Sequence, residues 1–266
     1  MKYALICGSE SGLAKASINV LDKHGYTIFC CDIKYKNPSQ ENNKYFIPMD
    51  ITNTESIVEA YNFIKTKTDK LDVVSSFAGI VILGSLVELP PETLDRIIVI
   101  NLTGTYKVNN IFFDMVKKAN GRIINISSEY DKICGIPFHG YYTITKHGVK
   151  VYNDSLRREL LSQNVKVIAI RPGAFKTNMQ GGITSQFEKV VEETKLYKEP
   201  LANMKKMMTS ELDKAKPTTK FEKVFEKAIT KKKPKKIYSI NNSFKMKILS
   251  ALPRGMQDWA FKKFLK

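Results

Sequence analysis

The sequence lacks any apolar run that approaches the ~20 residues a helix needs to cross a bilayer. Its first ten residues, MKYALICGSE, run from a strand pattern directly into a glycine-containing loop. This is not the layout of a secretory signal peptide, which has a basic start, an apolar stretch and a small-residue cleavage site. The expected location is therefore the cytoplasm.

Cysteine is also scarce, with only Cys7, Cys30, Cys31 and Cys134 in 266 residues. Their spacing does not match that of metal ligands, so no metal site is expected. Cys30 and Cys31 are neighbours in an apolar run that reads as a strand, so their side chains point to opposite faces. We expect free and mostly buried thiols in a reducing compartment.

Acidic residues are few compared with basic ones, and the net charge is +17. Most of the excess lies in the last quarter, where Lys205 to Lys266 contain 17 Lys and one Arg against three Glu and two Asp. A basic face toward anionic lipid or nucleic acid is one interpretation. A solvated surface is the other, and it is favoured because the lysines form no recognisable nucleic-acid motif. No nucleic-acid partner is expected.

Apolar runs alternate with helical patterns over the first two thirds of the chain. Strands that are apolar throughout and alternate with helices indicate a parallel sheet that is covered on both faces. Right-handed crossovers make such a sheet doubly wound, which predicts a Rossmann-like, three-layer α/β sandwich in one domain over residues 1–266. The strand patterns lie at 3–7, 26–32, 45–50, 71–79, 121–128, 165–173 and 235–240, and the longest helical patterns lie at 91–118 and 142–162.

Local signals add two helix boundaries. Gly25 is placed to terminate the first helix, because glycine readily adopts the left-handed conformation there. Thr52 and Glu55 have the spacing of a capping box at the start of a later helix.

Two C-terminal segments depart from the alternating pattern. Residues 178–215 are interpreted as a mobile substrate lid of loops and short helices over the carboxyl edge of the sheet. Residues 243–266 alternate apolar and basic residues at helical spacing, which predicts a basic amphipathic extension. This extension could contact an anionic membrane or pack on a helix or a second subunit, and packing is slightly favoured.

Apolar residues of the lid and of segment 133–139 predict a flexible, lipophilic wall, which suits a lipophilic alcohol or ketone. A lid that packs on the core is the alternative. The residues are Phe138, Met179, Phe187, Leu196, Met204, Met207 and Met208.

The loop CGSESGLA at 7–14 follows the first strand and opens the first helix. Gly8 permits a tight turn, Gly12 permits close approach of the backbone to a diphosphate, and the helix N-terminus offers free N–H groups. Asp32 ends the second strand, where a carboxylate binds ribose hydroxyls and repels a 2′-phosphate. The expected cofactor is NAD, although Lys34 and Lys36 leave NADP open. A plain turn and a solvated aspartate are the alternatives.

The chain resembles the short-chain dehydrogenase/reductase family of the single-domain type, closely up to about Thr177 and more loosely beyond it. The matching pieces occur in family order. They are G-x-x-x-G-x-A at 8–14, Asp50, Ala78–Gly79, Asn101 in VINLTG, INISS at 124–128, Tyr142-x-x-x-Lys146 and RPGAFKT at 171–177. There are three departures. The family's Asn-Asn-Ala-Gly reads Ser76-Phe77-Ala78-Gly79, Ala14 replaces a glycine, and the interval from Ser128 to Tyr142 is one residue longer than usual.

The resemblance implies a site. The catalytic residues it implies are Asn101, Ser128, Tyr142 and Lys146. In the family the asparagine acts through a helix kink and a water, and the lysine also holds the nicotinamide ribose. The cofactor-binding residues it implies are Gly8, Ser9, Ser11, Gly12, Leu13, Asp32, Asp50, Ile51, Ala78, Gly79, Tyr142, Lys146, Pro172, Gly173, Phe175 and Thr177. It also implies a homodimer or homotetramer that pairs through the helices at 91–118 and 142–162.

Helical spacing distinguishes the two adjacent tyrosines. Tyr142 and Lys146 are four residues apart and share a helical face, whereas Tyr141 and Lys146 are five apart and do not. A nearby ammonium favours a phenolate, so Lys146 is expected to lower the pKa of Tyr142. His147 is expected on the helix surface, and the role of His139 stays open.

The expected function is hydride transfer between NAD(P) and a secondary alcohol or ketone, with Tyr142 as the acid/base. A nicotinamide-dependent epimerase or dehydratase is one alternative, but such chains usually carry a sizeable second domain. A catalytically silent NAD(P)-binding sensor or scaffold is another. It would not require Asn101, Ser128, Tyr142 and Lys146 together.

Overall fold

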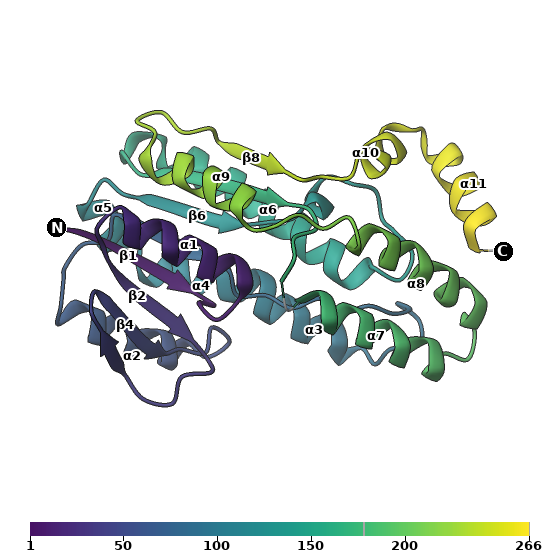
Figure 1. Cartoon of the computed structure of the whole chain (residues 1–266), viewed down its shortest axis with the longest axis horizontal. Helices are drawn as coiled ribbons and strands as arrows, with labels where there is room; N and C mark the ends of the chain where they lie inside the picture. Colours follow the sequence, from purple (N-terminus) through teal and green to yellow (C-terminus); the bar gives the residue numbers. More distant parts are fainter. Residues whose placement is uncertain (178, 266) are drawn as a thin grey trace.

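The computed structural model describes residues 1–177 and 179–265, with only the backbone for residues 179, 180, 211 and 264. The described strands form one eight-stranded sheet in the order β3-β4-β2-β1-β5-β6-β7-β8, which is parallel except for β3 on β4 (Figure 1). The predicted fold class is confirmed. The strands are β1 (Lys2–Cys7), β2 (Tyr26–Asp32), β3 (Ser39–Glu41), β4 (Lys44–Pro48), β5 (Val73–Ser76), β6 (Arg122–Ile126), β7 (Lys166–Pro172) and β8 (Ile237–Ile240).

Strand β3 is the one strand that the sequence patterns did not predict. It consists of Ser-Gln-Glu, and all three residues are exposed. It pairs antiparallel with β4 at the edge of the sheet. A short polar edge strand has no apolar alternation, so hydrophobic periodicity cannot detect it.

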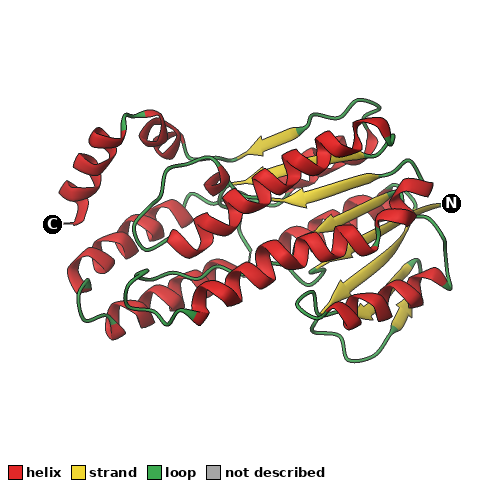
Figure 2. Cartoon of the chain, turned by 180° about the vertical axis from the view of Figure 1, so that it is seen from behind, coloured by secondary structure: helices red, strands yellow, loops and turns green. Residues whose placement is uncertain are grey.

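Helices cover both faces of the sheet (Figures 1 and 2). On one face, α1 (Gly12–Lys23) packs beside α9 (Thr219–Thr230). On the other lie α2 (Thr54–Lys65), α4 (Gly104–Ile111) and α6 (Gly140–Glu159). Along β1, Ala4 and Ile6 enter one buried cluster while Leu5 and Cys7 enter the other. Because successive side chains point to opposite faces, a strand buried on both sides must be apolar throughout.

The long helical pattern at 91–118 is not one regular helix. It consists of α3 (Glu92–Ile98), a π-helical turn (Val99–Thr103), α4 and α5 (Phe113–Lys118). The π-turn contains Asn101, which is buried. Single π-turns within α-helices occur frequently at functional sites because they redirect one side chain.

One of the two predicted helix boundaries is confirmed. Gly25 has φ +70° directly after the end of α1, as a left-handed terminator requires. The capping box at Thr52 and Glu55 is wrong, because Asn53 caps α2 and accepts a hydrogen bond from Ser56 N at 3.1 Å. The Thr52 hydroxyl instead donates to Asp50 Oδ1 at 2.8 Å, so the turn at Asp50 uses the group that would have formed the cap.

Residues 178–215 are more helical than the sequence suggests. They contain α7 (Met179–Glu193) and α8 (Lys198–Leu212), each 15 residues long, where loops and short helices were expected. Gly181 and Gly182 favoured the loop interpretation, but both lie within α7 with open space around them. Both helices extend beyond the end of the sheet (Figures 1 and 2). The mobility of this segment stays a prediction.

The C-terminal extension is helical as expected. It forms α10 (Phe244–Ala251) and α11 (Arg254–Leu265), and α11 packs against α8. Met246 and Phe261 join an apolar cluster whose buried members are Leu83 and residues of the lid and of segment 133–138. In the described part of the chain, no helix is both long and apolar enough to cross a bilayer.

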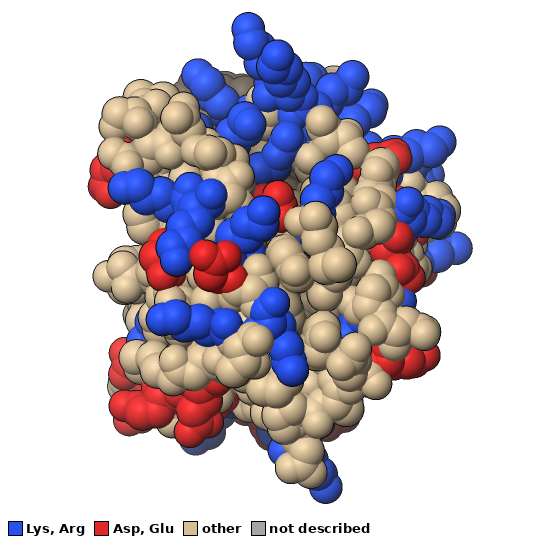
Figure 3. Space-filling view, turned by 90° about the vertical axis from the view of Figure 1, so that its left-hand side faces the viewer, with Lys and Arg blue, Asp and Glu red and all other residues tan. Residues whose placement is uncertain are grey.

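The positive charge is distributed over the surface. Figure 3 shows basic side chains spread over one face and gathered toward its top, with an acidic group at the lower left. The loop between α9 and β8 contributes five exposed lysines within 231–236. These lysines are solvated and lie far from the carboxyl ends of the strands, so they take no part in the cavity described next.

Candidate active site

One large cavity of about 1200 Å³ runs along the carboxyl ends of the strands. It extends from the glycine loop after β1, past the ends of β5 and β6, to α10. Parallel α/β sheets collect ligands at this edge. Three of the four implied catalytic residues line it, namely Ser128, Tyr142 and Lys146. The fourth, Asn101, lies behind the loop at 79–80.

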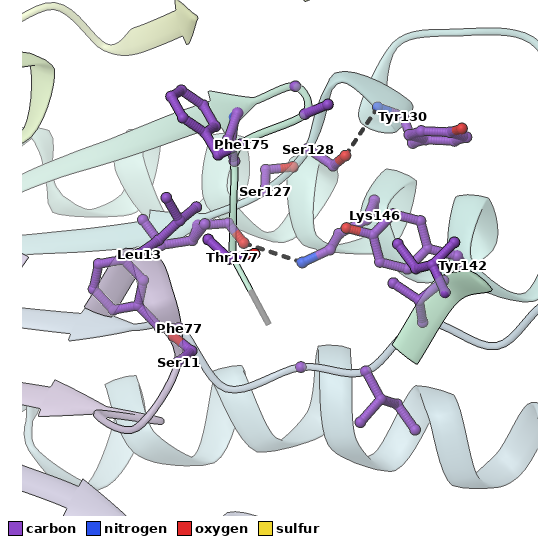
Figure 4. Close-up of a pocket in the computed structure, with 18 of the residues that line it drawn as sticks. Ser11, Leu13, Phe77, Ser127, Ser128, Tyr130, Tyr142, Lys146, Phe175 and Thr177 are labelled. Carbon is purple, nitrogen blue, oxygen red and sulfur yellow. Dashed lines mark hydrogen bonds between the residues drawn. The ribbon is translucent and has the colours of Figure 1, made fainter. Parts of the chain in front are cut away.

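Tyr142 and Lys146 project from α6 toward the same part of the cavity (Figure 4). The Lys146 Nζ atom lies 5.5 Å from the centroid of the Tyr142 ring and donates to the Ile126 carbonyl at 3.2 Å. Tyr141 is buried on another side, where its hydroxyl donates to the Ser85 carbonyl at 3.4 Å. The structure therefore places Tyr142, not Tyr141, beside Lys146.

Ser128 lies directly beyond β6 and is buried at the cavity wall. It is hydrogen-bonded to Tyr142, and its Oγ also accepts from Tyr130 N at 3.3 Å. The Ser127 hydroxyl instead donates to Asp131 Oδ2 at 2.7 Å. Thus Ser128 is the serine that meets the phenol.

The extra residue between Ser128 and Tyr142 is accommodated in the intervening loop. The loop begins with a 3₁₀ turn at Glu129–Asp131. Phe138 then adopts φ +63°, a left-handed conformation that is uncommon for a bulky side chain. Because this loop absorbs the longer interval, α6 keeps the register that turns Tyr142 toward Ser128.

The pKa of Tyr142 is raised to about 12, chiefly by burial. The hydrogen bond from Ser128 opposes this shift, while the carboxylates of Glu129 and Asp131 add to it. The expected lowering by Lys146 is therefore wrong for this structure. The Lys146 Nζ lies over the ring and is bonded to a backbone carbonyl, and burial lowers its own pKa to about 8 against the opposing charge of Asp131.

Asn101 acts as a clamp on the chain after β5. Its Oδ1 accepts from Ile80 N at 2.8 Å, and its Nδ2 donates to the Ile80 carbonyl at 2.9 Å and to Thr145 Oγ1 at 3.1 Å. These bonds join the π-turn, the cavity wall at 79–80 and α6. The side chain contacts Ile80 and Thr145 rather than Lys146, so its evident role is to position the wall.

The glycine loop has two positions that exclude a side chain. A Cβ at Gly8 would lie 2.5 Å from Ala78 N, and the residue has φ +72°. A Cβ at Gly12 would lie 2.7 Å from Thr177 Cγ2. Ser11 caps α1 by accepting from Ala14 N at 3.3 Å. The positive end of the α1 dipole therefore faces the cavity, which favours an anionic group such as a diphosphate.

The Asp32 carboxylate lines the cavity at the end of β2. Its two oxygens accept from Glu10 N at 2.9 Å and Lys34 N at 3.1 Å, which leaves lone pairs for two hydroxyl groups. The Ser9 side chain is buried against Tyr35 at 3.0 Å and does not line the cavity.

The remaining predicted cofactor residues lie around the same cavity. Asp50 Oδ1 accepts from both Thr52 N and Thr52 Oγ1 at 2.8 Å, so this carboxylate mainly shapes a turn. Phe175 is buried against Phe221, with ring centroids 5.9 Å apart. Thr177 contacts the glycine loop. The others that line the cavity are Leu13, Ile51, Ala78, Gly79, Pro172 and Gly173.

Several residues in or beside the cavity escaped the sequence interpretation. Tyr130 presents its ring edge-on to Tyr142 at 5.6 Å. Asp131 forms a buried ion pair with Arg171 at 2.6 Å. Segment 241–246, more than 90 residues after Tyr142, lines the cavity, and Ser243 N donates to Glu129 Oε2 at 2.6 Å. The charged residues that directly follow Ser128 could have been noticed in the sequence as neighbours of the site. Segment 241–246 could not, because only tertiary packing brings it to the cavity.

The two histidines near the site differ. His147 is exposed on α6, as predicted, and its Nδ1 lies 3.0 Å from the Thr143 carbonyl. His139 is buried in the cavity wall. Met179 of the predicted lipophilic wall lies outside the residues whose side chains are described, whereas Phe187 and Met204 are fully buried in the lid.

Together, the residues that line the cavity form a site that fits a dinucleotide cofactor. A glycine turn, a capped helix N-terminus and a strand-end carboxylate line the same cavity as Tyr142 and Lys146. This order matches the phosphate, ribose and nicotinamide positions of a Rossmann-type cofactor.

Sequence and structure comparisons give the family. The family described as short chain dehydrogenase matches residues 2–188. Retinol dehydrogenase 7 of Mus musculus is 33% identical over 204 residues, which cover 73% of this chain and 63% of that protein. The 17-beta-hydroxysteroid dehydrogenase type 6 of Rattus norvegicus is 33% identical over 202 residues, covering 73% and 62%. The chain thus matches less than two thirds of the length of these relatives.

Solved structures agree on the fold. A short chain dehydrogenase from Burkholderia cenocepacia J2315 in complex with NADP superposes with a TM-score of 0.72 at 16% identity, over the full length of both chains. Because the family match covers residues 2–188, more than half of the sequence, the chain belongs to the short chain dehydrogenase family, as the order of its motifs predicted.

Proposed function

We propose that this protein is an oxidoreductase that transfers a hydride between NAD(P) and a lipophilic secondary alcohol or ketone. The observation that carries the proposal is the meeting of Tyr142 and Ser128 in a cavity shared with the glycine loop. The relatives named as retinol and hydroxysteroid dehydrogenases support an apolar alcohol as substrate. NAD is the proposed preference, because the Asp32 carboxylate would repel a 2′-phosphate.

The residues divide the chemistry between them. When bound, the nicotinamide supplies the hydride acceptor or donor. Ser128 holds the substrate oxygen through its hydroxyl and stabilises developing charge. Tyr142 gives or takes the hydroxyl proton. With a pKa of about 12, its phenol is protonated at neutral pH, so it is suited to donate a proton to a ketone.

Lys146 has a second role in this proposal. Its buried Nζ sits above the Tyr142 ring at the end of β6. An ammonium there donates hydrogen bonds to the hydroxyls of a ribose. Asn101 keeps the loop at 79–80 in place beside it.

A panel of secondary alcohols and ketones, including steroids and retinoids, tests the proposal. Absorbance of the reduced nicotinamide is read with NAD and NADP. Tyr142→Phe should reduce kcat by at least ~10²-fold, as expected for loss of a general acid/base, with cofactor binding retained. Tyr141→Phe is the matched control, because its hydroxyl donates to the Ser85 carbonyl rather than to Ser128. Full activity of Tyr142→Phe would refute the assignment, and cofactor binding without any turnover would favour a silent sensor.

A homodimer through α4 and α6 is part of the proposal. Tyr106 and Val151 on these helices are 50% and 61% exposed, and Ile144 is also exposed. Exposed apolar side chains on adjacent helices favour a self-complementary interface. Sedimentation should give a dimer for the wild type and a monomer for Val151→Glu, whereas an unchanged oligomer would exclude this face.

Contact with an anionic membrane through α10 and α11 is also proposed. Phe244 and Trp259 are 71% and 67% exposed, next to exposed Lys245, Lys262 and Lys263. This combination suits an interfacial helix. Trp259 is the only tryptophan in the sequence, so its emission reports on α11 directly. Its emission should shift to shorter wavelength with vesicles of phosphatidylserine but not of phosphatidylcholine alone. No shift with either would favour packing of the extension.

Cytoplasmic location completes the proposal. All four cysteines are free, and Cys7, Cys30 and Cys31 are buried. Unpaired thiols are typical of reducing compartments. A fluorescent fusion read by microscopy tests this, and signal confined to the secretory lumen would exclude it.

A further inference from the structure

His139 is a buried titratable side chain that the proposed mechanism does not use. It lies three residues before Tyr142, lines the cavity and is 2% exposed. Its Nδ1 lies 3.3 Å from the Pro137 carbonyl oxygen. Because a carbonyl only accepts, Nδ1 carries the proton in this contact, and Nε2 is left as a bare acceptor.

That acceptor has no protein partner. Among the described residues, Nε2 of His139 is one of the few buried side-chain atoms without a hydrogen bond. Burial also lowers the pKa of His139 to about 4, so the ring is neutral at physiological pH. An unsatisfied acceptor in an apolar wall is costly, and such groups call for an explanation such as a bound donor.

The surroundings of His139 connect it to the reacting position. Its ring stacks on Tyr130 at 5.5 Å, and Tyr130 meets Tyr142 edge-on at 5.6 Å. On another side it contacts Phe187, with ring centroids 5.8 Å apart. The ring centroids of His139 and Tyr142 therefore lie no more than about 11 Å apart, since 5.5 Å and 5.6 Å are the two distances through Tyr130.

The chemistry of the wall selects the kind of donor. The cluster around segment 133–138 and the lid is apolar, with Leu83, Ile136, Leu201 and Met204 among its buried members. An ammonium loses a large hydration free energy when it enters such a wall, whereas a hydroxyl loses much less. A neutral hydroxyl is the donor that this position accommodates.

We propose that His139 accepts a hydrogen bond from a second hydroxyl group of the substrate, remote from the carbon that reacts. The inference rests on the proposed oxidoreductase function and narrows its substrate class. The substrate is a rigid apolar molecule that carries oxygen functions at both ends, one held by Ser128 and Tyr142 and the other by His139. A site that hydrogen-bonds a substrate hydroxyl discriminates strongly against analogues that lack it.

The test uses matched substrates in the full-length protein. Androstane-3,17-diol has hydroxyls at both ends of one rigid skeleton, and androstan-3-ol and androstan-17-ol carry one each. We expect kcat/KM for the diol to exceed that of the better mono-alcohol by about 10- to 100-fold in the wild type. The advantage should lie mainly in KM, because the remote bond is made equally in the ground and transition states.

Three variants identify the residue responsible. His139→Phe keeps an aromatic ring against Tyr130 but removes the acceptor, so the ratio of diol to mono-alcohol should fall to about one. His139→Gln restores a carbonyl acceptor and should recover part of the ratio. His147→Phe, on the exposed side of α6, should leave the ratio unchanged. Because each ratio compares two substrates in the same variant, losses common to both cancel.

The outcomes separate this inference from the proposed function. Turnover of the mono-alcohols with no advantage for the diol would leave the proposed function intact and overturn the role of His139. A ratio that persists in His139→Phe would overturn it as well. If none of the compounds is turned over, their binding affinities are measured by calorimetry instead. Tighter binding of the diol that depends on His139 supports the inference, and equal binding or none of either class overturns it.

Discussion

Replacing Lys146 by methionine should change the pH dependence of stability in a predictable way. Lys146 is 7% exposed, and burial lowers its pKa from 10.5 to about 8. This difference corresponds to about 3 kcal/mol of unfavourable free energy that the folded state carries when the lysine is protonated. Methionine has a similar length and no charge, so Lys146→Met removes the penalty.

The sign follows from proton counts. Between pH 8 and 10.5 the unfolded chain holds the Lys146 proton while the folded protein has released it. Stability therefore rises with pH in this window, and the penalty is present in full below pH 8. From pH 7 to pH 10 the wild type should gain about 2.5 kcal/mol relative to Lys146→Met. Loss of the bond to Ile126 and of the contact with the Tyr142 ring is a pH-independent cost to first order, and it cancels in this difference.

The assay is chemical denaturation at pH 7 and pH 10, supported by thermal melting. For a chain of this size, 2.5 kcal/mol corresponds to a shift of roughly 5–10 °C in relative Tm. Lys150→Met, one turn further along α6, is the matched control and should follow the wild type at both pH values. Parallel changes in wild type and Lys146→Met would refute the reasoning, because they would mean that Lys146 is solvated when the protein is folded.

Three further outcomes are expected. Gly8→Ala should abolish nucleotide binding and destabilise the fold, because its Cβ would meet Ala78 N at 2.5 Å. Gly25→Ala, with φ +70° and open space around its Cβ, should cost only about 1–2 kcal/mol of folding free energy. Equal denaturation midpoints for the two variants would contradict this expectation. Asn101→Leu should lower the free energy of unfolding by about 2–4 kcal/mol and raise KM, because it leaves the buried Ile80 amide and carbonyl unpaired. Asn110→Leu, on the exposed side of α4, should be nearly neutral in the same denaturation assay. Asp32→Ser should shift the ratio of kcat/KM for NADP over NAD upward by at least ~10-fold, and an unchanged ratio would remove the carboxylate from cofactor selection.

The sheet was predictable because its signals are local. Each central strand is buried on both sides, so it appears in the sequence as an uninterrupted apolar run, as in Ala4 to Cys7. The exposed strand β3 and the helices α7 and α8 were not predictable in the same way. The first has no apolar residue, and in α7 the pair Gly181–Gly182 imitates a loop.

The residues of the candidate site likewise fall into those that local sequence signals predict and those that only the tertiary structure brings together. A four-residue spacing within one helix places Tyr142 and Lys146 together, and this requires no knowledge of tertiary structure. Residues 241–246 approach the site from a distant part of the chain and carry no motif, so only the packed sheet brings them there. The same holds for Asn101, whose clamp on Ile80 depends on a π-turn in the middle of a regular helical pattern.

The pKa of Tyr142 shows what spacing alone cannot provide. The distance between a tyrosine and a lysine on one helical face suggested a phenol with a lowered pKa, yet the pKa is raised to about 12. Burial contributes most, and the carboxylates of Glu129 and Asp131 contribute further because the 3₁₀ turn after Ser128 brings them near. A helical spacing fixes which groups face each other, but their titration depends on every charge and every desolvated surface around them. Burial also lowers the pKa of Lys146, so the same desolvation that makes Tyr142 harder to ionise makes Lys146 harder to protonate. The buried site therefore favours the neutral phenol.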